Sequence, residues 1–406
     1  MKRAMPLFLF FFCAAMMIAP RALSAAEETL SNYIKPYGNL YMFLGYKRSA
    51  TYDAADNEHA DNDLVYNIND NSNLGMRFEY EKYSGVFELG FSDFKDGRIV
   101  KIRKAYGVYT FDYGKLMIGQ DWNPYVQWSH DFADYSRSKG LGALSEEPCI
   151  QFKYTIFGFY IDLIRPNIAS DQFTFLDDKT DPAIDLQARY ELRNKDYEAT
   201  TGLPLDQIQA FIPKIAIGYQ YEHEIASIGV GVAGNFYYVD NKSSRKYNKD
   251  WIISYLVYLN TEVRFWIMEL HLNAGFSVNP ANFGIDVETT GNDAYPAGAA
   301  LAIHNVATGK YEIKDTWNTQ GYFEMGFKAH KMVSIYLGYG ICATDYPVPG
   351  AKLDLAMEYY FNVKINIAGL IALTPSFCMR DYMEDFSGDK EGYDITAGIL
   401  GTVSFY

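Results

Sequence analysis

The chain has 406 residues, of which 49% are hydrophobic, 17% aromatic and 21% charged, and its formal net charge at pH 7 is −14. This acidity excludes nucleic acid as a partner, because phosphate groups repel a chain that has no basic surface. A slightly negative mean hydropathy combined with 35 Tyr and 27 Phe indicates one of two arrangements. Either the aromatic residues fill a sandwich core, or strands turn every second residue to lipid.

The first 26 residues have the features of an export signal. A basic start precedes an apolar run over residues 7–19, and small residues precede Glu27. This is the pattern of a cleavable signal peptide, and the run is too short for a membrane-spanning helix. We therefore expect residues 1–26 to be removed and residues 27–406 to form a single domain.

The cysteines of the mature chain do not form a disulfide framework. Cys149, Cys342 and Cys378 are an odd number in an exported protein, so at most one pair can form. We expect buried thiols in the wall of the domain.

The first predicted strand covers residues 37–47, and an acidic, Asn-rich segment over residues 48–70 follows it. We expect this segment to be a solvated external loop. Its Asp and Asn oxygens suit calcium, but the ligand spacing and terminal Glu of a calcium loop are missing. The sequence therefore predicts no metal site.

A clear alternation begins at residue 73. Leu74, Met76 and Phe78 share one face of the predicted strand, whereas Arg77 and Glu79 share the other. Beyond a turn at residues 83–85, the same alternation continues to residue 92. A period of two with one polar face is typical of a barrel strand whose other face meets lipid.

Two further strands precede the longest polar loop of the first half. They cover residues 98–112 and 115–121, and the loop follows at about residues 123–148. Loops of this length in compact domains are usually functional or disordered. This one carries a mixture of charged and aromatic side chains: Trp128, His130, Asp131, Asp134, Tyr135, Arg137, Lys139, Glu146 and Glu147. A pore wall that carries Arg103, with a charged loop folded against it, would have this pattern.

The remaining alternating segments bring the predicted strand count to sixteen. They cover residues 150–154, 159–165, 214–220, 225–238, 251–263, 265–278, 317–327, 332–343, 353–362, 364–379 and 393–406, with a long external loop at 166–209. Short and long connections alternate, and an even count returns both ends to one side of the membrane. The sequence thus predicts an all-β fold: a transmembrane antiparallel up-and-down β-barrel of sixteen strands.

Several of these segments resemble Gram-negative general porins. Residues 103–108 read Arg-Lys-Ala-Tyr-Gly-Val, and residues 111–120 read Phe-Asp-Tyr-Gly-Lys-Leu-Met-Ile-Gly-Gln. Both are similar to the fourth and fifth strands of that family, while residues 71–79 and 37–41 resemble its second and first strands. The match covers the first third of the mature chain. Beyond it, only the spacing of strands and connections resembles the family.

The resemblance implies a functional site and a cellular setting. Arg77 and Arg103 match basic positions that face an inward-folded third external loop, and Lys101 shares the parity of Arg103. The loop carboxylates Asp131, Asp134, Glu146 and Glu147 would oppose them and set up a transverse field. The family also implies a homotrimer in the outer membrane, contact with lipid and lipopolysaccharide, and insertion by the barrel-assembly machinery.

The carboxyl end resembles the aromatic-terminated last strand of outer-membrane barrels. Ile399 and Val403 share their parity with Phe405, so Phe405 is expected to face lipid and Tyr406 to fall on the polar parity. The pattern predicts that Phe405 and Tyr406 act as an assembly signal, although it departs from the usual one in which the final residue faces lipid.

Three functions remain open at this point, and none is enzymatic. None of the six histidines lies in a motif with a catalytic mechanism, and no cofactor is expected. The leading interpretation is a water-filled channel for small hydrophilic solutes, with a mild preference for cations. A selective porin is the first alternative: Gly119-Gln120-x-Trp122 resembles dicarboxylate porins, and Trp122, Tyr125 and Trp128 would suit a sugar track. The second is a non-conducting barrel that serves as an adhesin or structural protein.

Overall fold

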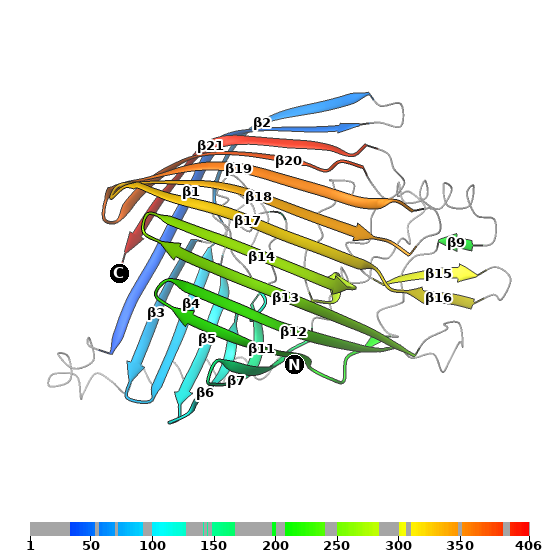
Figure 1. The fold of residues 1–406 in the computed structure, drawn as a ribbon, viewed down its shortest axis with the longest axis horizontal. Helices are drawn as coiled ribbons and strands as arrows, with labels where there is room; N and C mark the ends of the chain where they lie inside the picture. Colours follow the sequence, from blue (N-terminus) through cyan, green and yellow to red (C-terminus); the bar gives the residue numbers. More distant parts are fainter. Residues whose placement is uncertain are drawn as a thin grey trace.

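Sixteen antiparallel strands close into one barrel (Figure 1). The computed structural model describes residues 33–52, 57–69, 72–91, 100–126, 141, 144, 148–166, 197–199, 208–239, 250–283, 300–305, 310–347, 351–384 and 390–405. The barrel strands are β1 (Ile34–Tyr52), β3 (Ser72–Tyr80), β4 (Tyr83–Phe91), β5 (Val100–Thr110), β6 (Gly114–Asp121), β7 (Cys149–Ile156), β8 (Phe159–Ile164), β11 (Lys214–His223), β12 (Ala226–Val239), β13 (Trp251–Phe265), β14 (Met268–Val278), β17 (Trp317–His330), β18 (Val333–Asp345), β19 (Leu353–Ala368), β20 (Ile371–Asp381) and β21 (Gly392–Phe405).

The ring closes between the first and the last strand. β1 pairs with β21 from Gly38 opposite Phe405 to Thr51 opposite Gly392. Closure pairs each of the sixteen barrel strands with a neighbour on both sides, which satisfies backbone N–H and C=O groups that lipid cannot. Within the described residues, no helix is long and apolar enough to cross a membrane.

Five short elements accompany the barrel. They are β2 (Glu58–Ile68), β9 (Tyr197–Ala199), β10 (Ile208–Gln209), β15 (Leu301–Asn305) and β16 (Lys310–Lys314). β10 extends the pairing of β12, whereas β9, β15 and β16 form a separate three-stranded sheet. The 3₁₀ turn η5 (Pro280–Phe283) follows β14.

The prediction of a loop at residues 48–70 is wrong over most of that range. β1 continues to Tyr52, and β2 pairs with its upper half from Met42 to Tyr52, forming the hairpin at the top of Figure 1. At its tip, Arg48 donates to Glu58 at 2.6 Å, and this hydrogen bond lowers the pKa of the Glu58 carboxyl. The mostly polar residues 58–63 hide the strand pattern, although Leu64 and Tyr66 share an exposed face with Tyr46 and Leu44 of β1.

Tight turns join the strands at one end of the barrel. Glu81, Phe157 and Trp266 lead these turns with φ near +50°, the left-handed conformation of two-residue hairpin loops. Two of these turns lie elsewhere than expected. The turn expected at residues 83–85 lies at residues 81–82, so Tyr83 already begins β4. The sequence placed a break at about residue 363, but β19 runs on to Ala368 and turns at Gly369, where φ is +29°.

The two faces of each strand meet different surroundings. Along β20, Ile371, Leu373 and Phe377 are exposed on the outer face, while Thr374 and Arg380 between them are buried. β13 and β8 show the same strict alternation. Apolar side chains on an exposed outer face require an apolar surrounding, so the outer face is built to contact lipid. This confirms the predicted barrel.

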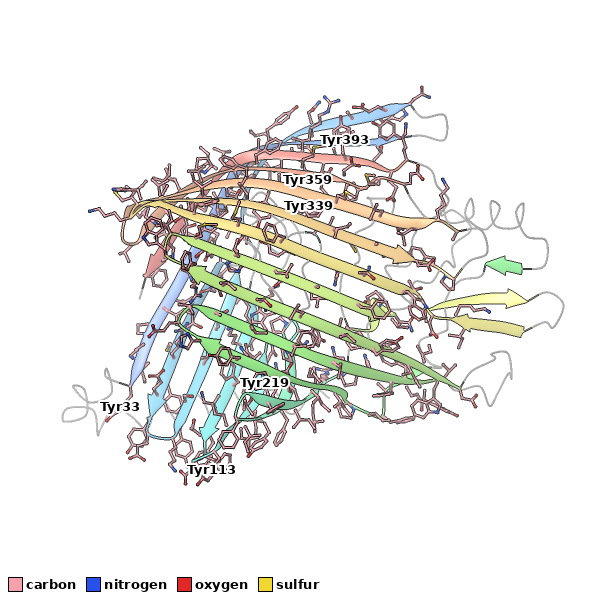
Figure 2. All side chains as sticks on the ribbon, in the orientation of Figure 1. Tyr33, Tyr113, Tyr219, Tyr339, Tyr359 and Tyr393 are labelled. Carbon is pink, nitrogen blue, oxygen red and sulfur yellow. The ribbon has the colours of Figure 1, made fainter. Side chains whose placement is uncertain are left out.

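Tyrosines lie at both ends of the strands (Figure 2). Tyr33 and Tyr113 lie toward the end with tight turns, and Tyr393 lies near the opposite end, at the start of β21. Tyr113 is 70% exposed and its ring centroid lies 6.2 Å from that of Phe157 in the next turn. Amphipathic rings at both rims are typical of the aromatic belts that anchor a barrel in the bilayer interfaces.

Candidate functional site

Arg103 lies on the inner face of β5 as part of a buried ion pair. Its Nε is 3.3 Å from Oε1 of Glu88 on β4, and both side chains are 7% exposed. The methylene carbons of Arg103 cover Gly90, whose missing side chain leaves room for them. The guanidinium lies 5.5 Å from the ring of Trp122. Arg103 is thus fixed by contacts on two sides.

Arg77 joins this group through an aromatic ring. The Tyr37 hydroxyl on β1 donates to Glu88 at 2.8 Å, and the Arg77 guanidinium on β3 lies 4.7 Å from the Tyr37 ring. Unlike Arg103, Arg77 is exposed. Glu88 therefore connects the two predicted arginines, and four neighbouring strands contribute to one cluster.

Lys101 lies next to Arg103 on the same face. Its methylenes approach Gly90, and its side chain is half-buried. The structure thus brings the predicted basic residues together on β3 and β5. The opposing carboxylates Asp131, Asp134, Glu146 and Glu147 lie outside the described residues, as do the signal segment 1–26, Trp128 and Tyr406.

Charges of alternating sign continue around the wall beyond Arg103. Lys104 Nζ lies 3.6 Å from Asp121 on β6, and Lys153 on β7 lies directly opposite Asp162 on β8. Lys214 on β11 completes the series and donates to the Tyr125 hydroxyl at 3.3 Å. Asp121, Asp162 and Lys214 follow the inward parity of their strands, and this parity is the signal that could have revealed them. Lys104 has the opposite parity to Arg103 and reaches the inner face through the β-bulge that shifts the register between Glu88 and Leu89, so alternation alone would have missed it.

The opposite wall holds its acidic residues in hydrogen bonds. Glu324 on β17 is fully buried and accepts hydrogen bonds from Tyr322 and Tyr360. Farther round, Arg380 on β20 donates to Glu358 on β19 at 2.5 Å, and Glu358 is also fully buried. These carboxylates are neutralised or covered by their own wall.

Inward tyrosines share a packing rule. Five of them lie directly opposite a glycine on the next strand and contact the space above it: Tyr37 with Gly75, Tyr160 with Gly218, Tyr258 with Gly231, Tyr336 with Gly326, and Tyr360 with Gly338. Covering a strand glycine with an aromatic ring stabilises the sheet. Because the ring lies along the wall, it occupies less of the lumen, and its hydroxyl can reach a neighbouring carboxylate.

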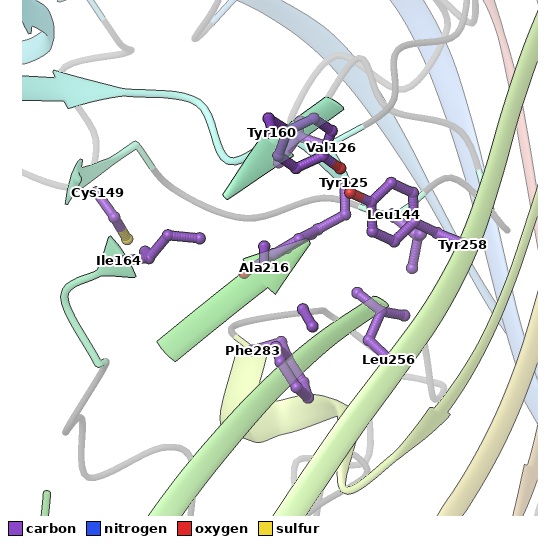
Figure 3. Packing of buried hydrophobic residues seen from close by; sticks show 11 residues of the cluster. Tyr125, Val126, Leu144, Cys149, Tyr160, Ile164, Ala216, Leu256, Tyr258 and Phe283 are labelled. Carbon is purple, nitrogen blue, oxygen red and sulfur yellow. The ribbon is translucent and has the colours of Figure 1, made fainter. Parts of the chain in front are cut away.

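Described residues of the long loop pack on the inner face. Tyr125 is fully buried, with its ring centroid 6.0 Å from those of Tyr258 on β13 and Phe283 in η5. Leu144 belongs to the same cluster (Figure 3). The idea that Tyr125 belongs to an accessible sugar track is therefore wrong, since no solute can reach a fully buried ring.

The described part of the chain offers no metal centre. It contains no group of three or more His, Cys, Asp or Glu residues that could hold an ion. No disulfide joins Cys149, Cys342 and Cys378, and all three are buried.

Comparison with known proteins places this geometry in a class. No family model and no curated protein matches the chain. Solved structures do match: the outer membrane channel DcaP of Acinetobacter baumannii has a TM-score of 0.60 at 15% identity, covering 92% of this chain and 97% of that one. Salmonella typhi OmpF has a TM-score of 0.52 at 11% identity over 92% and 97%, and the anion-selective porin of Comamonas acidovorans 0.50 at 10% over 92% and 99%.

The chain therefore has the fold of the outer-membrane porins. This confirms the resemblance found in the first third of the mature sequence and extends it, as a fold, over nearly the whole chain. At these identities the likeness concerns the fold alone.

The Arg103–Glu88 pair gives a first prediction. Replacing Glu88 by Gln leaves the buried Arg103 charge without its partner, which should lower the free energy of unfolding by roughly 3 kcal/mol. Urea titration of the protein in lipid vesicles measures this change. Glu79→Gln is the matched control, because its partner Lys35 lies 3.9 Å away and both side chains are more than half exposed. An equal decrease in the free energy of unfolding in the two variants would show that burial does not make the Arg103–Glu88 pair more important for stability than an exposed pair.

Proposed function

We propose that this chain is an outer-membrane porin: a water-filled channel through which small hydrophilic solutes and ions diffuse passively. One observation carries the proposal, namely a closed barrel whose outer face is apolar and whose inner face is charged. Exposed inner groups such as Arg77 and Lys101 are costly without water or a counter-ion. A hydrated lumen that crosses an apolar layer is a conduction path.

The cellular setting of the proposal comes from the sequence. Residues 1–26 would direct export, and residues 27–406 would form one barrel domain that the barrel-assembly machinery inserts beside lipid and lipopolysaccharide. A homotrimer is the expected assembly. No cofactor is needed for passive diffusion, and no chemical step is assigned to any residue.

The long loop is the expected constriction. Its described residues Tyr125 and Leu144 lie against the inner wall, which supports an inward course for the segment at about residues 123–148. A loop across the lumen narrows the water path. In open solution, salt screens exposed charges that are more than ~8 Å apart, whereas charges at a narrow point are poorly screened.

A mild cation preference follows if the loop carboxylates Asp131, Asp134, Glu146 and Glu147 reach this constriction. Four acidic groups would then face Arg77, Lys101 and Arg103, of which Arg103 is already paired with Glu88. The local balance would favour potassium over chloride.

A selective channel for dicarboxylates is the second candidate, and the inner wall gives one reason for it. Arg77 and Lys101 are exposed or half-exposed, whereas Glu88, Glu324 and Glu358 are at most 5% exposed. These three acids are thus less accessible than the basic residues of the same wall, whereas Glu79, on the face of Arg77, is exposed beside Lys35. Anionic solutes would be favoured if the loop carboxylates lie away from the path.

Conductance tests the central proposal. Purified protein added to a planar lipid bilayer should produce stepwise increases in current in potassium chloride. A correctly folded barrel that inserts but stays silent would instead support the adhesin or structural alternative.

Ion selectivity distinguishes the two candidates. In a potassium chloride gradient, the wild-type reversal potential should show a mild cation preference, and Arg77→Gln/Arg103→Gln should strengthen it because Glu88 and the loop carboxylates lose their counter-charges. Asp112→Asn, at an exposed pair with Lys82 in the tight turns at the end of the barrel, serves as a control for charge changes away from the cluster. A wild-type pore that prefers chloride would reverse the sign and support the dicarboxylate channel.

Assembly gives a further prediction. Phe405 is 44% exposed on the outer face, and its ring covers Gly38 where β1 meets β21. Deleting Phe405 and Tyr406 should therefore block insertion and leave periplasmic aggregate, because the closing seam loses its lipid-facing aromatic residue. Cell fractionation measures this, with Ser404→Ala as a control on the inner face. Normal outer-membrane levels of the truncated chain would refute the assembly signal.

A further inference from the structure

Two inward glycines face the loop from the far wall. Gly275 on β14 lies between the inward residues Asn273 and Ser277, which are at most 2% exposed, and Gly340 on β18 precedes the inward Cys342, which is 3% exposed. In a strand, glycine weakens the sheet unless the missing side chain makes room for something. The atoms that fill the side-chain space differ between Gly275 and Gly340 and the other described glycines.

At Gly275 the space is filled by Leu144. A Cβ at this position would lie 3.1 Å from both Cδ atoms of Leu144, which is fully buried. At Gly340 the fit is tighter, because a Cβ would collide with the backbone carbonyl of Leu141. Leu141 is 2% exposed and packs with Cys342 and Ala356.

These contacts connect opposite sides of the barrel. The loop leaves β6 at Asp121 and returns to β7 at Cys149. In the ring of sixteen strands, β18 lies eight strands from β6 in either direction, so Leu141 contacts the wall diametrically opposite the start of its loop. Leu141 thus lies on the far side of the ring from the strand at which its loop begins.

The other described glycines are filled differently. Gly326 and Gly338 are covered by tyrosine rings of the wall itself, and Gly321 has no neighbour nearer than 3.7 Å to a Cβ placed there. Among the described glycines, only Gly275 and Gly340 have residues of the long loop in the side-chain space. The missing side chains of Gly275 and Gly340 thus make room for the loop, whereas those of the other glycines do not.

We propose that Gly275 and Gly340 are docking notches for Leu144 and Leu141, and that they set how far the loop stands from the far wall. They are positioning residues, and through the loop they determine the free cross-section and hence the size limit for solutes. The proposal rests on the channel function and names the contacts that regulate its width. A side chain added at either notch pushes the loop off this wall toward the accessible side at β3 and β5.

Alanine substitution tests the notches against a matched glycine. Gly340→Ala should lower single-channel conductance, raise open-channel noise and slow the entry of large sugars in liposome-swelling assays. Gly275→Ala should have a smaller effect, because the Leu144 side chain can shift by a few tenths of an ångström whereas a carbonyl in the backbone cannot. Gly321→Ala makes the same chemical change in open space and should resemble the wild type.

A second-site variant separates docking from general strain. Leu144→Ala should restore the conductance of Gly275→Ala, since it removes the colliding atoms. Leu141→Ala should not restore Gly340→Ala, because the colliding atom there belongs to the backbone. Wild-type conductance and noise in both glycine variants, with heat-stable barrels retained, would overturn the proposal.

Proteolysis gives a readout that does not depend on conduction. Cleavage between Asp121 and Cys149 by an added protease should be faster in Gly340→Ala than in the wild type or Gly321→Ala. If the wild type proves silent in bilayers, this assay still decides the docking of the loop, and the failure of the channel function is recognised separately. Equal cleavage rates in all three proteins would count against the notches.

Discussion

The closed ring of backbone hydrogen bonds is the constraint on which the rest of this structure depends. Lipid offers no partners for N–H and C=O groups, so a sheet can cross it only when its first and last strands pair. Here that seam joins β1 and β21 over a run of fourteen residue pairs that begins at Gly38 and Phe405. Once the ring is closed, each side chain must face either lipid or lumen. The period-two pattern, the burial of charge on one face and the confinement of function to the interior all follow from this choice.

That choice also explains how much of the fold the sequence predicts. The sixteen barrel strands follow from alternation, because a strand with lipid on one side cannot place a charge there without a large penalty. β2 escaped prediction because its apolar face is short: Leu64 and Tyr66 lie opposite Tyr46 and Leu44 of β1, but most residues before them are polar. The turn after β19 was placed too early, since Asn362 and Lys364 are polar residues on an inward face and only resemble the composition of a turn. Strand prediction fails where the contrast between a lipid face and a water face is weak, or where polar residues are taken as a turn although they share the inward face of one strand.

The candidate site was predictable in its members and not in its contacts. Arg77, Lys101 and Arg103 could be named from motif and parity, and the structure places them on β3 and β5, the two strands that flank β4. The burial of Glu88 between Arg103 and Tyr37 could not be read from the sequence, because Tyr37 is 51 residues away and approaches only once β1, β3 and β4 have paired in register. The fit of Leu141 and Leu144 to distant glycines is equally nonlocal. Such contacts depend on which strand faces which across the lumen, and that information appears only in the ring.

A final consequence concerns charge. The chain carries a formal net charge of −14, yet net charge does not describe the field that a solute meets inside. Hydrogen bonds from Tyr322 and Tyr360 cover Glu324, and Arg380 covers Glu358, so these acids are removed from the water path. Arg77 reaches water on the other side of the lumen. A buried, paired charge contributes little field at a distance, whereas an exposed one near a constriction acts in full. The selectivity of such a channel is therefore determined by which charges the wall hides and which it leaves exposed.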